Sequence, residues 1–367
     1  MWVCSVRRST RKILIIHQGA LGDFICCLPA LACLREAFPG VHLTIMGYRR
    51  VLELVDNRYY ADAIVSVDSA DMALLYQERQ EDPPDLRAFF ETFELIGLIG
   101  LNRSPFVENL RRISKERVVV IPPFPSGGKS IHMVDHLMSL PRCLGLPIHA
   151  TVPRLYLLDR DRDVAAMFLK GHDIDPEAFL VGIHPGSGSH AKTWPVERFL
   201  DLAHSFVEAY GAEVFFVIGP AEEKIREKLQ QLTLGSKRPV VLDDLPLPHL
   251  GAILERCRVF VGNDSGISHL AAAIGLPVVA IFGPTDPVRW APVGREVSLI
   301  RTALPCSPCE RRTMSRCTLR RCLLGVSVDE VGRAVDQIIK KRDERPAFHR
   351  ECPSIPREKL GVIGALH

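Results

Sequence analysis

Apolar runs typical of β-strands alternate with helical patterns through most of the chain, and this alternation limits the possible folds more than any other feature. KILIIHQG is followed by a stretch with apolar residues near helical spacing and then by VHLTIMG, which predicts a strand–helix–strand unit. A second series begins at FLVGIHPG and continues through PVERFLDLAHSFVEAYG, EVFFVIG, AEEKIREKLQQL, PVVLD, RVFVG and PVVAIFG. Such alternation predicts α/β architecture with parallel sheets.

The chain length agrees with two domains, because 367 residues exceed the usual size of a single hydrophobic core. PIHATVPRLYLLDRDRD contains proline and then becomes charged, as expected of an exit from the first domain and a linker. We therefore expect Rossmann-like, doubly wound domains over residues 1–160 and 175–345. The basic, proline-punctuated tail over residues 346–367 is expected to be poorly ordered.

Composition excludes several classes of protein. The net charge of +3 is too small to indicate nucleic-acid binding. No apolar run reaches the ~18 residues that a membrane-spanning helix needs, and the first residues have the wrong order for a signal peptide. Without an export signal, the 11 cysteines are expected to be reduced thiols. The sequence thus predicts a cytoplasmic protein that binds no nucleic acid.

The first strand ends in a glycine loop, HQGALGDF, that contains Gly19, Gly22 and Asp23. A dinucleotide-binding loop would read Gly-x-Gly-x-x-Gly, with an acidic residue near the end of the second strand, and neither is present. Hydride transfer is therefore disfavoured. Asp23 places a carboxylate at a strand-to-helix turn. It is either a first-turn residue favoured by the helix dipole or a functional group in a cleft.

The first loop of the second series, HPGSGSHAKTWP, has the composition of a phosphate-binding loop. Its small residues allow close approach, its N–H groups and hydroxyls can bind oxygens, and Lys192 can offset negative charge. The Gly-Lys-Ser/Thr of a Walker A motif is absent. The alternative is an ordinary surface loop.

GNDSGISHL, over residues 262–270, places polar residues between a strand and a helix. Asp264 or Ser265 can cap the helix, and Gly266 eases the turn. A helix N-terminus at the carboxyl end of a parallel strand is also an anion and nucleotide site. Both readings are compatible.

These three blocks, in this order, resemble the bacterial heptosyltransferases of glycosyltransferase family 9, over about residues 12–340. The resemblance implies a GT-B fold, in which two Rossmann-like domains face each other across a cleft, with the acceptor on the N-terminal side and the nucleotide sugar on the C-terminal side. It also implies inverting, metal-independent transfer of L-glycero-D-manno-heptose from ADP-heptose to the inner core of lipopolysaccharide, at the cytoplasmic face of the inner membrane.

The resemblance assigns roles to individual residues. Asp23 matches the general base and Lys192 the cation that balances charge on the departing diphosphate. Asp264 is expected to cap its helix and orient a donor hydroxyl, and either Glu222 or Glu223 to hold the ribose. The expected donor-binding residues are Ser187, Gly188, Ser189, Glu222, Glu223, Asp264, Ser265, Gly266, Ile267 and His269.

The implied acceptor is an anionic lipid-linked oligosaccharide, either Kdo-lipid A or an extended inner core. Its phosphates and carboxylates would meet basic side chains of the N-terminal domain, and the enzyme would touch the inner membrane peripherally. The expected acceptor-side residues are Gly19, Gly22, Arg49, Arg50 and Lys129.

Four cysteines and several acidic pairs raise the question of metals. Cys306, Cys309, Cys317 and Cys322 have the spacing C-x2-C-x7-C-x4-C, which could close a structural zinc site, against the alternative of separate thiols. No catalytic metal is expected. Three Asp-x-Asp pairs lie in the linker, away from strand ends, and are interpreted as solvated charge: Asp159–Asp161, Asp161–Asp163 and Asp173–Asp175.

Two other classes of function remain open. One keeps the GT-B fold but uses a different sugar or acceptor, or epimerises a sugar nucleotide without any lipid acceptor. The other is a catalytically silent binding protein, which the presence of Asp23 and Lys192 disfavours.

Overall fold

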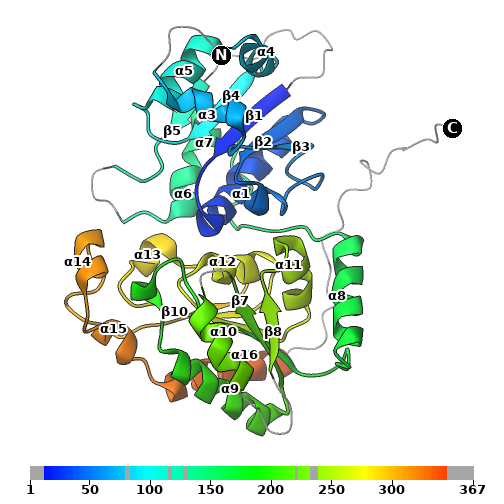
Figure 1. Cartoon of the computed structure of the whole chain (residues 1–367), viewed down its shortest axis with the longest axis vertical. Helices are drawn as coiled ribbons and strands as arrows, with labels where there is room; N and C mark the ends of the chain where they lie inside the picture. The colour runs from blue at the N-terminus through cyan, green and yellow to red at the C-terminus, as the bar shows by residue number, and fades with distance from the viewer. Residues whose placement is uncertain are drawn as a thin grey trace, which may run out of the picture.

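The computed structural model describes residues 12–78, 83–114, 118–126, 130–219, 222–231 and 239–344. The two halves of the chain each form an α/β unit, and the N-terminal half lies above the C-terminal half in Figure 1. Each half has its own sheet, and every strand pair in both sheets is parallel. The predicted fold class is confirmed.

The N-terminal sheet has the strand order β3-β2-β1-β4-β5. The order reverses beside β1, the place where open α/β sheets usually bind ligands. Its strands are β1 (Lys12–His17), β2 (His42–Gly47), β3 (Ala63–Ser66), β4 (Leu95–Ile99) and β5 (Val118–Ile121). Its helices are α1 (Leu21–Ala37), α2 (Arg49–Leu52), α3 (Ala70–Ala73), η1 (Leu74–Tyr76), α4 (Pro84–Glu91), α5 (Pro105–Ser114), α6 (Met133–Leu137) and α7 (Ser139–Cys143).

The C-terminal sheet has the order β11-β10-β9-β6-β7-β8, which reverses between β6 and β9. Its strands are β6 (Leu180–His184), β7 (Glu213–Ile218), β8 (Val240–Asp243), β9 (Val259–Asn263), β10 (Val278–Ile281) and β11 (Val297–Ile300). The helices are α8 (Asp159–Gly171), η3 (His190–Lys192), α9 (Val196–Tyr210), α10 (Glu223–Gln231), α11 (Leu247–Glu255), α12 (Gly266–Ala273), α13 (Pro287–Trp290), α14 (Arg311–Arg316), α15 (Arg321–Leu324) and α16 (Val328–Asp343).

The central strands explain why the sequence shows apolar runs instead of alternation. Every residue of β6 and β9 is buried. Val259 and Val261 belong to one apolar cluster and Phe260 to another, so both faces of the sheet are covered. Parallel strands in this position are apolar on both sides.

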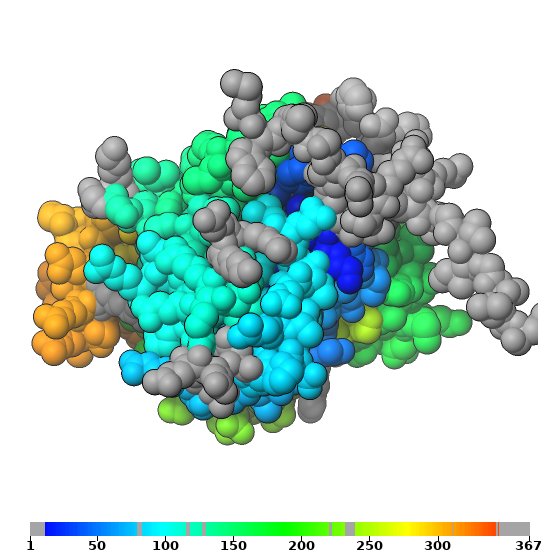
Figure 2. All heavy atoms as spheres, turned by 90° about the horizontal axis from the view of Figure 1, so that it is seen from above, coloured from blue at the N-terminus to red at the C-terminus, as the bar shows by residue number. Residues whose placement is uncertain are grey.

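The two halves touch where α1 and α12 begin. A Cβ atom added to Gly266 would lie 2.8 Å from Leu21 Cβ, and one added to Gly22 would lie 3.2 Å from His269 Cδ2. Seen from above, the N-terminal half covers much of the C-terminal half, and α8 in green and the orange segment around α14 project on opposite sides (Figure 2). The absence of side chains at Gly22 and Gly266 therefore allows the first turns of α1 and α12 to approach each other closely.

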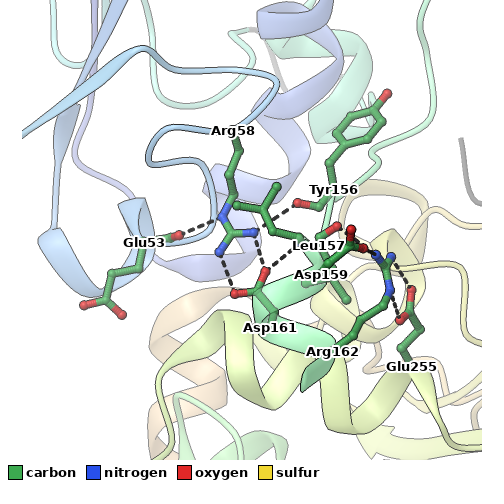
Figure 3. A network of polar contacts seen from close by, with 9 residues as sticks. Glu53, Arg58, Tyr156, Leu157, Asp159, Asp161, Arg162 and Glu255 are labelled. Carbon is green, nitrogen blue, oxygen red and sulfur yellow. Dashed lines mark hydrogen bonds and ion pairs between the residues drawn. The ribbon is translucent and has the colours of Figure 1, made fainter. Parts of the chain in front are cut away.

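The linker departs from the prediction at Asp161. Its side chain is 2% exposed and accepts two hydrogen bonds from Arg58, at 2.5 Å from Nη1 and 2.9 Å from Nη2 (Figure 3). The interpretation of Asp161 as solvated charge is wrong, because Arg58 of the N-terminal half neutralises it inside the protein. The remaining members of the acidic pairs are exposed: Asp159, Asp163, Asp173 and Asp175.

A second ion pair attaches the same helix to the C-terminal half. Arg162 in α8 donates to both carboxylate oxygens of Glu255 at the end of α11, at 2.9 and 3.1 Å (Figure 3). The start of α8 is thus bound to both halves. Within the described residues, no helix is both long and apolar enough to cross a bilayer.

Candidate active site

Asp23 lies in the first turn of α1, at the carboxyl end of β1. Its Oδ2 accepts a hydrogen bond from the Ala20 N–H at 3.1 Å. Burial raises the pKa of Asp23; the Ala20 N–H and the charge of Lys192 oppose this rise, and the charge of Asp264 adds to it. The carboxylate therefore interacts electrostatically with two residues of the C-terminal half.

Gly19 explains how the loop holds this carboxylate. A Cβ atom there would lie 2.7 Å from His17 Cε1 and 2.8 Å from Asp23 Cβ, so only glycine fits. The Gly19 N–H donates to His17 Nδ1 at 3.2 Å, and burial lowers the pKa of His17 to about 4. A neutral imidazole thus orders the loop. The predicted acceptor contacts of Gly19 and Gly22 stay predictions.

The C-terminal half contributes a polar cluster, which consists of Lys192, Asp264 and Thr285. Lys192 Nζ lies 3.1 Å from Asp264 Oδ2, and the Thr285 hydroxyl donates to the same oxygen at 2.6 Å. The Ser187 hydroxyl donates to the Asp264 carbonyl at 2.7 Å. Sequence reasoning missed Thr285, which lies directly after the predicted strand PVVAIFG.

The expected helix cap needs a correction. Ser265, not Asp264, is the N-cap of α12, and its hydroxyl accepts a hydrogen bond from the Ser268 N–H at 3.3 Å. The Asp264 carboxylate instead bonds Lys192 and Thr285. It is therefore directed toward the loops that follow β6 and β10, which suits a functional role better than a capping role.

Asn263 contacts the predicted phosphate loop on both sides of Lys192. Sequence reasoning did not identify this residue either. Its side chain is fully buried. Oδ1 accepts from the Trp194 N–H at 2.9 Å, and Nδ2 donates to the carbonyls of Pro185 and Gly186 at 2.9 and 3.1 Å. One amide therefore fixes the chain on both sides of Lys192. An asparagine at the end of a buried strand was the available signal.

Glu222 and Glu223 differ in their surroundings. Glu222 Oε2 accepts from the Gly219 N–H at 2.8 Å, and its carboxylate lies so close to Gly186 that a Cβ there would be 2.4 Å from Oε1. Glu223 is exposed at the start of α10. Of the two candidates, Glu222 lies against the predicted donor loop.

The other predicted donor-binding residues differ in location, from the protein surface to the contact between the two halves. Gly188 is exposed, and Ser189 and Ile267 are partly buried. His269 is 4% exposed, its Nδ1 lies 3.8 Å from Cys26 Sγ of α1, and burial lowers its pKa to about 4. His269 is thus a neutral side chain at the contact between the two halves.

The acceptor-side arginines begin α2, directly after β2. Both Arg49 and Arg50 are exposed, and Arg50 forms an ion pair with Asp244 of the C-terminal half. Arg50 therefore has a partner across the interface, whereas Lys129 lies outside the described residues.

The four C-terminal cysteines lie within electrostatic reach of one another. Cys306 and Cys317 are exposed, Cys309 is partly exposed and Cys322 is buried. Burial raises the pKa of Cys309 and Cys322; Cys306 and Cys317 raise both further, whereas backbone hydrogen bonds oppose the rise at Cys322. Among the described residues, no three His, Cys, Asp or Glu side chains are arranged to hold a metal ion. The described geometry therefore gives the zinc prediction no support.

Comparison with known proteins agrees with the sheet topology and the loops. Glycosyltransferase family 9 (heptosyltransferase) matches residues 126–318. Lipopolysaccharide heptosyltransferase 1 of Pseudomonas aeruginosa is 26% identical, over 82% of this chain and 87% of that protein. Lipopolysaccharide heptosyltransferase 3 of Escherichia coli is 30% identical, over 74% of this chain and 83% of that protein.

Among solved structures, the E. coli ADP-heptose lipopolysaccharide heptosyltransferase II superposes with a TM-score of 0.71 at 16% identity, over 90% of this chain and 99% of that one. At this identity the likeness concerns the fold. The sequence matches carry the assignment further: the chain belongs to glycosyltransferase family 9, the heptosyltransferase family, and has the GT-B fold.

Proposed function

We propose that this protein transfers heptose from ADP-heptose to the inner core of lipopolysaccharide, with inversion at the anomeric carbon. The names of its relatives support the donor and the acceptor class. The single observation that carries the mechanism is the position of Asp23. It lies in the first turn of α1 with its Oδ2 accepting the Ala20 N–H at 3.1 Å; burial raises its pKa, while the charge of Lys192 lowers it and that of Asp264 raises it.

In the proposed reaction, the Asp23 carboxylate accepts the proton of an acceptor hydroxyl while that oxygen bonds the anomeric carbon of heptose. The bond between this carbon and the diphosphate oxygen breaks, and its electron pair leaves with ADP. Attack from the face opposite the leaving group inverts the centre. A raised pKa makes the carboxylate a better base at neutral pH than an ordinary aspartate.

Lys192 supplies positive charge for the leaving diphosphate, so the proposed reaction needs no metal. Its ammonium group has three donors, and Asp264 accepts one of them. The others are available to phosphate oxygens, together with the backbone N–H groups of the loop around Gly188. Glu222, which lies beside Gly186, is the proposed partner of the ribose hydroxyls.

We further propose a cytoplasmic enzyme that touches the inner membrane peripherally, because its acceptor is lipid-linked. Arg49 is exposed beside the N-terminal sheet edge and is suited to anionic groups of that acceptor.

The decisive experiment mixes purified protein with ADP-heptose and a panel of heptose-deficient lipopolysaccharide cores, and follows ADP release and acceptor mass. Asp23→Asn is expected to lower turnover by about 10²–10⁴-fold while ADP-heptose still binds. Asp159→Asn is the matched control, since that carboxylate is fully exposed at the start of α8.

Two outcomes would reject the proposal. Conversion of ADP-heptose without any acceptor would indicate an epimerase, and binding without reaction on any core would favour a silent binding protein or a different acceptor. Full activity of the Asp23→Asn variant would show that Asp23 is not the general base, even if heptose transfer is observed.

A further inference from the structure

Two half-exposed tyrosines stand at the carboxyl edge of the N-terminal sheet, in the part of the molecule that contains Asp23. We propose that Tyr76, together with Tyr48, forms an aromatic wall on which a sugar ring of the acceptor stacks beside Asp23. This inference rests on the proposed function and names the part of the acceptor that the N-terminal half recognises.

Strand register brings the relevant residues together. His17 at the end of β1 pairs with Gly47 at the end of β2, so the residues that follow, Gln18 and Tyr48, leave neighbouring strands at the same edge. Gln18 belongs to the loop that continues to Asp23. The wall therefore stands beside the strand where the sheet order reverses, which is the usual ligand position in open α/β sheets.

Tyr76 is held in place from three directions. Asn109 Nδ2 donates to the carbonyls of Leu75 and Gln77, on either side of Tyr76, at 2.9 and 2.8 Å. The Tyr76 ring packs against Phe106 with centroids 5.0 Å apart. Gln18 Nε2 donates to the Tyr76 hydroxyl at 2.6 Å, which joins the ring to the Asp23 loop.

In spite of these contacts, the Tyr76 side chain remains 49% exposed and Tyr48 43% exposed. Asn109, in contrast, is 6% exposed, so a buried polar side chain supports an exposed aromatic ring. A rigid tyrosine offers a large contact face and loses little conformational entropy when a ligand binds. Its ring can cover the C–H face of a sugar while hydroxyl and amide groups at its edge bond the sugar oxygens.

Charge next to the wall favours an anionic saccharide over a neutral one. Arg49 and Arg50 follow Tyr48 directly and are exposed. Arg50 pairs with Asp244, and Arg49 is the residue between Tyr48 and Arg50 in the chain. A saccharide that carries a carboxylate or phosphate would thus find an aromatic face and a guanidinium on the same edge.

The test compares Tyr76→Ala with Tyr76→Phe in the transfer assay. Tyr76→Ala is expected to raise the acceptor KM at least about tenfold and to leave the donor KM unchanged. Tyr76→Phe keeps the ring and should stay within about threefold of the wild type. Met167→Ala, which truncates a 73% exposed side chain on α8, is the control for loss of exposed apolar surface.

A binding measurement separates this inference from the proposed function. A heptose-deficient core oligosaccharide freed of its acyl chains is titrated into the wild type and Tyr76→Ala, so no transfer is needed. Weaker binding by Tyr76→Ala supports the wall. Equal binding overturns it, as does a loss seen only with acylated acceptor, which would indicate a lipid chain. An unchanged acceptor KM with lower kcat would show that Tyr76 only positions the Asp23 loop.

Discussion

Removal of the Asp161 carboxylate should destabilise the protein strongly, because it leaves the charge of Arg58 buried without its anion. The Arg58 and Asp161 side chains are 4% and 2% exposed. After Asp161→Ala, the hydrogen bonds left to Arg58 within the described part of the chain are long ones to the carbonyls of Glu53 and Tyr156, at 3.4 and 3.3 Å. Breaking such a buried pair costs about 3–5 kcal/mol. The lower value already reduces the ratio of folded to unfolded protein roughly 100-fold.

Urea unfolding, followed by circular dichroism, measures this loss. The double variant Arg58→Met with Asp161→Leu should recover the part that arises from the buried charge, because two apolar side chains leave none, but not the bond that Asp161 Oδ2 accepts from the Leu158 N–H at 2.7 Å. Asp243→Ala, which breaks the exposed pair with Arg226, is the matched control and should change stability little. If Asp161→Ala were no more destabilising than Asp243→Ala, the reasoning from burial would be refuted.

Acid should inactivate the proposed base at a higher pH than it would inactivate an ordinary aspartate. Because the pKa of Asp23 is raised, kcat/KM should fall as pH decreases through that raised value, and a profile that stays flat down to pH ~4 would contradict this role. At the donor loop, Gly186→Ala places a Cβ 2.4 Å from Glu222 Oε1 and should raise the donor KM, whereas Gly171→Ala has open space around its Cβ and should not. Equal donor KM values for the two alanine variants would contradict a role of Glu222 in donor binding.

Much of the fold could be predicted because central parallel strands are apolar runs between recognisable helices. The β1–α1–β2 unit and the strands from β6 to β10 lie where the sequence indicated. No element was assigned within residues 68–125, where β4 and β5 are LIGLI and VVVI. Apolar runs this short cannot be distinguished from buried helix segments by periodicity.

The candidate site was predictable as a set of loops but not as a set of contacts. Asp23, Lys192 and Asp264 could be singled out because each lies in a loop or turn after a predicted strand, and the resemblance to glycosyltransferase family 9 supplied their expected roles. The bond from Lys192 to Asp264 spans 72 positions and the bond from Arg58 to Asp161 spans 103. Such partners depend on strand order and on domain packing, which local sequence patterns do not encode. For the same reason the sequence indicated only that Asp161 is one of several charged residues in a hydrophilic segment.

The contact between Gly22 and Gly266 acts as a mechanical stop for the two halves of the protein. An added Cβ at Gly266 would lie 2.8 Å from Leu21 Cβ and 3.1 Å from Gly22 N, so both side-chain and backbone atoms of α1 meet this glycine. A methyl group at Gly266 could not be accommodated unless the start of α1 moved away from α12, so the contact limits how closely the two halves approach. Gly22 and Gly266 thus help to set the spacing between Asp23, the proposed base, on one half and Lys192, the proposed cation, on the other. A single methyl group inserted there would act as a spacer, and misplacement of reacting groups by about 1 Å can lower a rate 10²-fold.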